Sequence, residues 1–181
     1  MAWRLKKTIV LVGMPGSGKT ALGTALARRL GVPFRDSDEE IVKAANMSIA
    51  EIFDRDGEPF FRKKESQVIA RLLAGKPGVL STGGGAFLQE SNRQAIHNAG
   101  VALWLDADLD LLWTRVRHKD SRPLLRTENP RATLAELYTA RVPYYAKADL
   151  SVEAIHGASI EAMTDRLIAK LLTRPDVLEK K

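Results

Sequence analysis

The most informative part of the sequence comes early, in the stretch Gly13-Met14-Pro15-Gly16-Ser17-Gly18-Lys19-Thr20. It matches the pattern G-x-x-x-x-G-K-[ST] at every fixed position. Its glycines let backbone N–H groups converge on a phosphate, and the helix that follows adds the positive end of its dipole. A chance glycine-rich turn is the alternative. The stretch lies between a β-branched run at 8–12 and an amphipathic pattern over 18–30, so we favour a phosphate-binding loop.

The polar residues of this loop have expected roles. Lys19 should reach the β- and γ-phosphates and take part in catalysis, and the hydroxyl of Thr20 should ligate Mg²⁺. Both expectations imply a bound nucleotide that carries β- and γ-phosphates. The nucleotide contacts that we expect from the loop are Gly16, Ser17, Gly18, Lys19, Thr20 and Ala21.

Strand-like and helix-like segments alternate along the whole chain. The candidate strands are 8–12, 33–35, 78–81, 101–105 and 150–152, with helical patterns between them and a closing one over 159–172. This alternation predicts a three-layer α/β domain over 1–181, in which helices cover both faces of a parallel sheet. Ligands of such sheets bind at the carboxyl ends of the strands. The tail 173–181 is polar, and we expect it to fray.

Composition excludes several classes of protein. The 181 residues include no cysteine, so disulfides, thiol catalysis and cysteine-ligated zinc are ruled out. The apolar run Ile9-Val10-Leu11-Val12 is far too short to span a membrane. We therefore expect a soluble, cytoplasmic monomer with no membrane partner. The net charge of +6 suits either nucleic acid or a polyanionic small molecule, depending on where the charges lie.

Two carboxylates follow the second candidate strand, Asp36 and Asp38. Either residue makes a good N-cap for the helix that follows, which is the simpler interpretation. Beside a phosphate loop, however, one carboxylate can hold Mg²⁺ through water and the other can accept the proton of an acceptor hydroxyl. The phosphate loop makes us favour this second interpretation.

Two further features suggest an anionic acceptor. Arg62 is either a solvated charge on a helix face or a bidentate partner for a carboxylate, and the sequence leaves both open. Thr82-Gly83-Gly84-Gly85 ends the third strand, where glycines allow a ligand to touch the backbone.

Basic residues gather after the fourth helix, at Arg115, Arg117, His118, Lys119, Arg122 and Arg126. Such clusters are usually solvated loops. A phosphoryl-transfer enzyme also needs mobile cations that close over the γ-phosphate, so we expect a lid over 117–130. Aromatic residues of the kind that bind single strands are missing from this segment, which makes nucleic acid the weaker interpretation.

Taken together, these motifs resemble the shikimate kinase family. The resemblance rests on Asp36-x-Asp38, Gly57-Glu58 with Phe61-Arg62 and Glu65, Thr82-Gly83-Gly84-Gly85, Arg122-Pro123-Leu124-Leu125, and Arg141 before Pro143 and Tyr145. It implies the nucleoside-monophosphate-kinase-like P-loop fold, with five strands in the order 2-3-1-4-5. It also implies the reaction of ATP with shikimate to give ADP and shikimate 3-phosphate.

The resemblance assigns roles to residues as well. It implies that Asp38 binds the acceptor hydroxyls and acts as base, and that Asp36 supports the Mg²⁺ shell through water. Shikimate would be held by Arg62 and Arg141 at its carboxylate, with Gly83, Gly84 and Gly85 lining the same pocket. Arg122 would be a catalytic lid arginine on the phosphates, and Arg115 would lie near the adenine.

One position departs from the family pattern. Eight residues after Arg141, where the family often has alanine, this sequence has Asp149, with Ala148 one place earlier. The register of the loop into the last strand is therefore left open. Three rival interpretations also stay open: a kinase of another hydroxy acid such as gluconate, a non-catalytic nucleotide-binding module, and a nucleic-acid-binding module suggested by charge alone.

Overall fold

A central five-stranded sheet organises the molecule. The structure is a computed structural model that describes residues 3–117 and 127–181. The sheet has the order β3-β4-β2-β5-β6, and all its strands are parallel. Its strands are β2 (Thr8–Val12), β3 (Phe34–Asp36), β4 (Val79–Ser81), β5 (Gly100–Asp106) and β6 (Leu150–Glu153). Counted along these five strands alone, the order is 2-3-1-4-5, so the predicted topology is confirmed.

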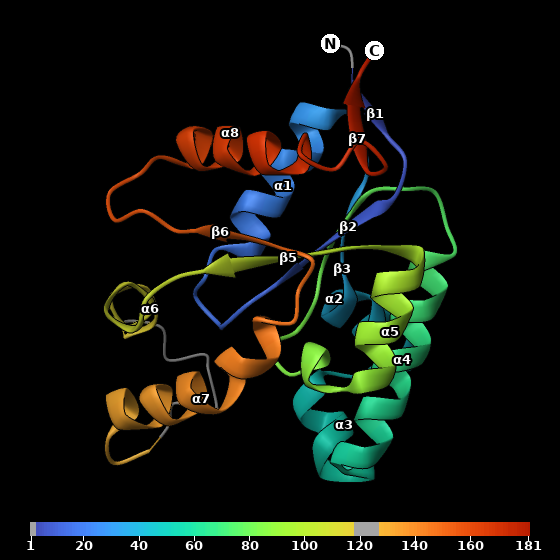
Figure 1. The fold of residues 1–181 in the computed structure, drawn as a ribbon. Coiled ribbons are helices and arrows are strands. Elements are labelled where there is room, and N and C mark those ends of the chain that lie inside the picture. Colours follow the sequence, from blue (N-terminus) through green and yellow to red (C-terminus); the bar gives the residue numbers. More distant parts are fainter. Residues whose placement is uncertain (1–2, 118–126) are drawn as a thin grey trace.

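Helices cover both faces of this sheet (Figure 1), in agreement with the predicted three layers. On one face, Ile9 and Leu11 of β2 pack with α1 (Lys19–Leu30) and α8 (Ile160–Leu171). On the other face, Val10 and Val12 belong to a second apolar cluster. The helices of that face are α4 (Glu58–Leu73), α5 (Glu90–Ala99), α6 (Leu109–Val116) and α7 (Pro130–Tyr145). β2 is buried throughout because it contributes side chains to both clusters.

A third and smaller apolar cluster lies apart from the sheet. It joins α4 to the helices α2 (Ser37–Ala45) and α3 (Ile49–Asp56), and its four buried residues are Ile41, Ile52, Phe61 and Val68. The start of α3 is fixed by a capping box, in which Ser48 accepts from the backbone of Glu51 and the Glu51 side chain accepts from the backbone of Ser48. This cluster supports the segment that carries the two carboxylates and Arg62.

The prediction of a frayed tail over 173–181 is wrong. Residues Leu178–Lys180 form strand β7, which pairs antiparallel with β1 (Trp3–Leu5), and the two ends of the chain lie side by side (Figure 1). Val177 and Leu178 are buried in the same cluster as α1 and α8. The sequence did not indicate this strand, because two apolar residues among polar neighbours give no alternating pattern. Its partner, β1, also lies at the opposite end of the chain. No helix in the described ranges is long and apolar enough to cross a membrane.

Candidate active site

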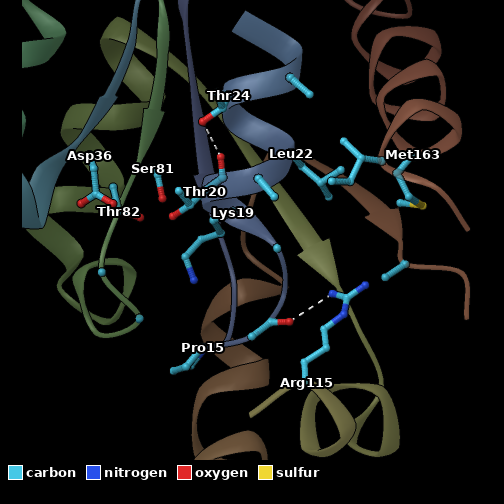
Figure 2. A pocket seen from close by; sticks show the side chains of 18 of the residues that line it. Pro15, Lys19, Thr20, Leu22, Thr24, Asp36, Ser81, Thr82, Arg115 and Met163 are labelled. Atoms are coloured by element: carbon cyan, nitrogen blue, oxygen red, sulfur yellow. Dashed lines mark hydrogen bonds between the residues drawn. The ribbon is translucent and has the colours of Figure 1, made fainter. Parts of the chain in front are cut away.

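The carboxyl ends of β2, β3 and β4 open onto one crevice of about 960 Å³. Figure 2 shows Lys19 and Thr20 at the start of α1, with Asp36 to one side of them and Arg115 and Met163 to the other. The residues that line the crevice come from the phosphate loop, from α1, from the turn after β3, from the loop after β4, from α6 and from the segment between β6 and α8. The predicted phosphate loop, acidic pair and glycine run therefore share one site.

The phosphate loop has the backbone that its glycines permit. Gly13, Gly16 and Gly18 have φ angles of 152°, 87° and 96°, in the region that side chains disfavour. The Lys19 ammonium donates to the carbonyl oxygens of Gly13 and Met14 at 2.7 and 3.1 Å. The loop is thus curled around the lysine, with the Lys19 amine placed over the concave side where phosphate oxygens would lie.

Arg115 lines the crevice and contacts the phosphate loop, and its predicted place near the adenine stays a prediction. Its Nη1 donates to the carbonyl of Gly16 at 3.0 Å, as the dashed line in Figure 2 shows, so the arginine is held against the loop. Beyond it the lining turns apolar, which suits the flat ring of a base. The residues there, which sequence reasoning missed, are Ala154, Ala158, Ser159, Ile160 and Met163.

A contact between two side chains links the segment after β6 to helix α6 at this apolar end. His156 Nε2 lies 2.7 Å from Asp108 Oδ2, and Asp108 is the N-cap of α6, the helix that carries Arg115. The backbone N–H of Leu111 and the imidazole of His156 both hydrogen-bond to Asp108 and hold its pKa below the ordinary value. The segment after β6 is therefore tied to the helix that faces it across the crevice.

Asp36 fits both interpretations of the acidic pair. Its Oδ1 accepts from the backbone N–H of Asp38 and Glu39 at 2.8 and 3.3 Å, so it is the N-cap of α2. It also lines the crevice together with Thr20. Since the cap uses Oδ1, the second carboxylate oxygen is left for a hydrated cation.

Asp38 has one carboxylate oxygen that is shielded from solvent. Its Oδ1 is buried and has no hydrogen-bond partner among the described residues. Burial raises the pKa of this carboxyl, and the negative charge of Asp36 raises it further. The positive charges of Lys19 and Arg62 oppose the rise. A carboxylate that lines the crevice and has a raised pKa is well suited to accept a proton.

Each glycine of the run after β4 lies against a different functional side chain. A methyl group on Gly83 would lie 2.9 Å from Asp38 Oδ1, and one on Gly84 would lie 2.5 Å from Arg141 Nη1. A methyl group on Gly85 would overlap the guanidinium of Arg62. The three residues that the resemblance assigns to shikimate thus converge on one short loop. Only glycine leaves room for all of them.

Arg62 is not a solvated charge on a helix face. Its Nη1 donates to Glu65 Oε1 at 2.9 Å, and its Nε donates to Glu58 Oε1 at 3.4 Å. The Glu65 side chain is only 1% exposed, and burial raises the pKa of its carboxyl although Arg62 opposes the rise. The acidic partner fixes the guanidinium toward Gly85. The guanidinium is therefore oriented by its own helix, and its binding of an acceptor anion stays a prediction.

Arg141 belongs to α7 and reaches the same loop from the other side. Its side chain is nearly buried, and it meets Gly84 rather than solvent. The loop after α7 has a defined register: Asp149 Oδ2 accepts from the backbone N–H of Ala102 at 2.8 Å, and its Oδ1 lies 3.0 Å from His97 Nδ1. Asp149 therefore docks the start of β6 onto β5 at the position where the sequence departs from the family.

The lid prediction over 117–130 falls mostly outside the described residues. Arg122 lies in that undescribed part of the chain, between Arg117 and Thr127, so its predicted contact with the phosphates stays a prediction. At the far end of the range, α7 begins at Pro130, with Asn129 as its N-cap.

The donor set suits Mg²⁺. Within the described residues, no three or more His, Asp or Glu side chains gather into a protein-only metal cage. Mg²⁺ usually keeps several waters and binds one or two carboxylates together with substrate phosphates. Thr20, Asp36 and Asp38 line the crevice beside the phosphate loop and provide such a partial set, and the metal roles of Thr20 and Asp36 stay predictions.

A phosphate loop and a carboxylate share one crevice, and two arginines lie against the glycine loop that borders it, which together define a P-loop kinase site. The chain belongs to the shikimate kinase family, because that family's model matches residues 15–172. It is therefore an ATP-dependent phosphotransferase with an alcohol acceptor.

Curated relatives agree with this assignment. The chain is 68% identical to the shikimate kinase of Ruegeria pomeroyi over 175 residues, which is 97% of this chain and 90% of the relative. It is 67% identical to that of Cereibacter sphaeroides over 176 residues, which is 97% of this chain and 88% of the relative.

Solved structures give the same result. The shikimate kinase of Acinetobacter baumannii in complex with shikimate has a TM-score of 0.86 at 36% identity, with 92% of this chain and 93% of that chain covered. A gluconokinase of Sinorhizobium meliloti has a TM-score of 0.63 at 19% identity, with 94% of each chain covered, so it shares the fold alone.

Proposed function

We propose that this protein transfers the γ-phosphate of ATP to the 3-hydroxyl of shikimate and releases ADP and shikimate 3-phosphate. The observation that carries the proposal is the shared loop Gly83–Gly85, which sets Asp38, Arg141 and Arg62 beside the phosphate loop. An acid recognised by two arginines and a hydroxyl recognised by a carboxylate describe one small molecule that carries both groups.

Asp38 acts on the acceptor hydroxyl in this proposal. The acceptor O–H gives its proton to the Asp38 carboxylate as the bond from acceptor oxygen to phosphorus forms. The bond from phosphorus to the bridging oxygen of ADP breaks in line with it. Because Asp38 lines the crevice beside the phosphate loop, its carboxylate can meet that hydroxyl. The raised pKa of the carboxyl makes it a stronger base than an ordinary aspartate.

The arginines orient the acceptor. Arg62 and Arg141 approach the glycine loop from α4 and α7, so a carboxylate between them can accept from both. With its acid fixed at this end, the ring of the acceptor is directed toward Asp38. Fixing the acceptor and the γ-phosphate in one geometry is a large part of what catalysis of phosphoryl transfer requires.

The nucleotide binds along the loop and α1. Backbone N–H groups of residues 16–21 hold the phosphates, and Lys19 exchanges its carbonyl partners for phosphate oxygens. Thr20 and Asp36 would hold Mg²⁺, which neutralises charge on the phosphates when it is bound. Arg115 and the apolar residues after β6 bind the base, and Arg122 reaches the phosphates from the lid. We further propose that the protein acts as a cytoplasmic monomer.

A coupled assay of ADP release tests the proposal, with shikimate, gluconate and nucleoside monophosphates compared as acceptors. We expect release that depends on both shikimate and Mg²⁺, with kcat/KM for shikimate at least about 100-fold above that for the other acceptors, as a site built for both acid and hydroxyl allows. Faster turnover of gluconate or of a nucleotide would contradict the proposal.

A further inference from the structure

Tyr145 is a buried phenol that the mechanism above does not use. It is the last residue of α7, and its side chain is fully buried. Its hydroxyl donates to the carbonyl oxygen of Gly84 at 2.6 Å, across 61 positions of sequence. Its ring lies 6.2 Å from that of Trp104 on β5. The hydroxyl is therefore fixed in place by packing and directed at the middle of the glycine loop.

Arg141 lies one turn before Tyr145 on α7 and contacts the same glycine. Its Nη1 lies where a side chain on Gly84 would begin, 2.5 Å from the position of a Cβ. The positive charge of Arg141 also acts on the Tyr145 hydroxyl. Gly84 is thus contacted at its carbonyl by Tyr145 and on its Cα side by Arg141.

The two arginines of the site are held by different means. Arg62 has two acidic partners on its own helix, Glu58 and Glu65. No carboxylate lies within 4.0 Å of Arg141 in ranges 3–117 and 127–181. A long arginine side chain without an acidic partner needs neutral groups to fix its direction. The groups that do so here are the Tyr145 hydroxyl and the surface of Gly84.

The phenol is suited to this task over the working pH range. Burial raises the pKa of Tyr145, while the positive charge of Arg141 opposes the rise only in part. The hydroxyl therefore stays protonated and continues to donate to Gly84 beside the Arg141 guanidinium. No negative charge forms that could compete with a substrate carboxylate for the guanidinium.

We propose that Tyr145 is a positioning residue for the acceptor's carboxylate, because its hydroxyl ties Gly84 to α7 and sets the direction of Arg141. This inference rests on the proposed function, which places the carboxylate against Arg141. Tyr145 itself does not touch the substrate. Its effect is transmitted through the guanidinium and through the shape of the loop.

The test is Tyr145→Phe, which keeps the ring and removes the hydroxyl, with Tyr144→Phe as a matched control. Tyr144 is the neighbouring residue, is 37% exposed, and its ring faces Arg93 and Lys147 instead of the site. We expect KM for shikimate to rise about 3- to 10-fold in Tyr145→Phe, the worth of one buried hydrogen bond, with KM for ATP unchanged within about twofold. Tyr144→Phe should leave both KM values unchanged.

A double-variant cycle separates positioning from a general loss of stability. If Tyr145 acts through the guanidinium, then Tyr145→Phe should raise KM for shikimate far less when Arg141→Met is already present. Additive effects of the two substitutions would overturn the inference, as would equal rises in both KM values. If Tyr145 served only stability, Tyr145→Phe would lower the melting temperature but would not raise KM for shikimate relative to KM for ATP.

A second variant keeps the inference testable if Tyr145→Phe does not fold. Gly84→Ala leaves Tyr145 intact and places a methyl group against Arg141 Nη1, so it should also raise KM for shikimate selectively. An unchanged KM in Gly84→Ala would overturn the inference. If the wild-type enzyme shows no shikimate-dependent ADP release, the proposed function fails as well. If the wild-type enzyme turns over shikimate and Tyr145→Phe has the same KM, only this inference fails.

Discussion

The Cα of Gly85 lies directly against the guanidinium of Arg62, so that a methyl group at this position would overlap its nitrogens. Gly85 itself has φ −93° and ψ −8°, which an alanine adopts readily, so the glycine is required by the contact and not by the backbone. The relation between these two residues gives the first prediction.

Gly85→Ala should displace the Arg62 guanidinium and weaken acceptor binding. A charge-assisted contact is worth about 1.5–3 kcal/mol, so we expect KM for shikimate to rise by about tenfold or more, with KM for ATP little changed. Steady-state kinetics with each substrate varied in turn measures this split. The control is Gly75→Ala, since an added methyl there meets only Leu72 O, at an ordinary 3.5 Å. Equal kinetics for the two alanine variants would contradict the prediction.

Asp38→Asn should abolish most turnover and keep ATP binding. A positioned general base contributes about 10²–10⁴ to the rate, and the amide cannot take the proton. We expect kcat to fall by that factor while the Kd for ATP, measured by calorimetry, stays within about threefold of wild type. Glu39→Gln, at the exposed next position, should be silent. Near-normal turnover in Asp38→Asn would remove this residue from the role of base.

The same substitution should stabilise the protein in a pH-dependent way. A carboxyl whose pKa is raised by folding costs stability above that pKa, and the cost disappears as the pH falls toward the pKa of the unfolded chain. Burial raises the pKa of Asp38, so Asp38→Asn removes this cost. The melting temperature should exceed that of wild type by about 2–6 °C at pH 8, and by less at pH 5. A margin that grows toward low pH would contradict the sign of the pKa shift.

Arg62→Ala should have two separable effects. We expect KM for shikimate to rise about 10- to 150-fold, from the loss of a contact worth about 1.5–3 kcal/mol. The buried Glu65 carboxylate also loses its partner, which costs about 3–5 kcal/mol and lowers the melting temperature by about 6–20 °C. When Glu65→Gln is added to Arg62→Ala, much of the lost melting temperature should return. The KM for shikimate should stay as high as in Arg62→Ala alone. Recovery of both together would show that Arg62 acts only through stability.

Deletion of residues 177–181 should destabilise the fold. It removes β7 together with the buried side chains of Val177 and Leu178, each worth about 1.5–3 kcal/mol. We expect the melting temperature to fall by at least about 6 °C. Deletion of Lys181 alone is the control, because it lies beyond β7 and is exposed. If the truncated chain has the same melting temperature as the wild type, the pairing of β1 with β7 does not contribute to stability.

The sheet could be predicted from the sequence because its signals are local. The run 8–12 is apolar and β-branched. The segments between strands are long enough for the helical spacing of their apolar residues to be recognised. The parallel topology follows from the strict alternation. The β1–β7 pairing could not be found in this way, since each strand is only three residues long and neither has a pattern of its own.

The sequence pointed to residues that the structure brings together at the glycine loop, but it could not predict their contacts. Asp38, Arg62 and Arg141 are separated by tens of residues, so no spacing rule links each of them to its own glycine. The apolar residues after β6 carry no motif either. They follow the carboxyl end of a strand, however, and the rule that ligands bind at that edge could have indicated them. Their interaction with a base depends on shape, which a linear pattern does not record.

The small cluster of Ile41, Ile52, Phe61 and Val68 holds the acceptor side of the crevice separately from the two cores that flank the sheet. Because so little apolar surface secures α2 and α3, these helices should open as a unit while the strands stay intact. In native-state hydrogen exchange their amides should lose protection well before those of β2. We therefore expect α2 and α3 to unfold locally before the sheet does, and shikimate to slow their exchange more than ATP does.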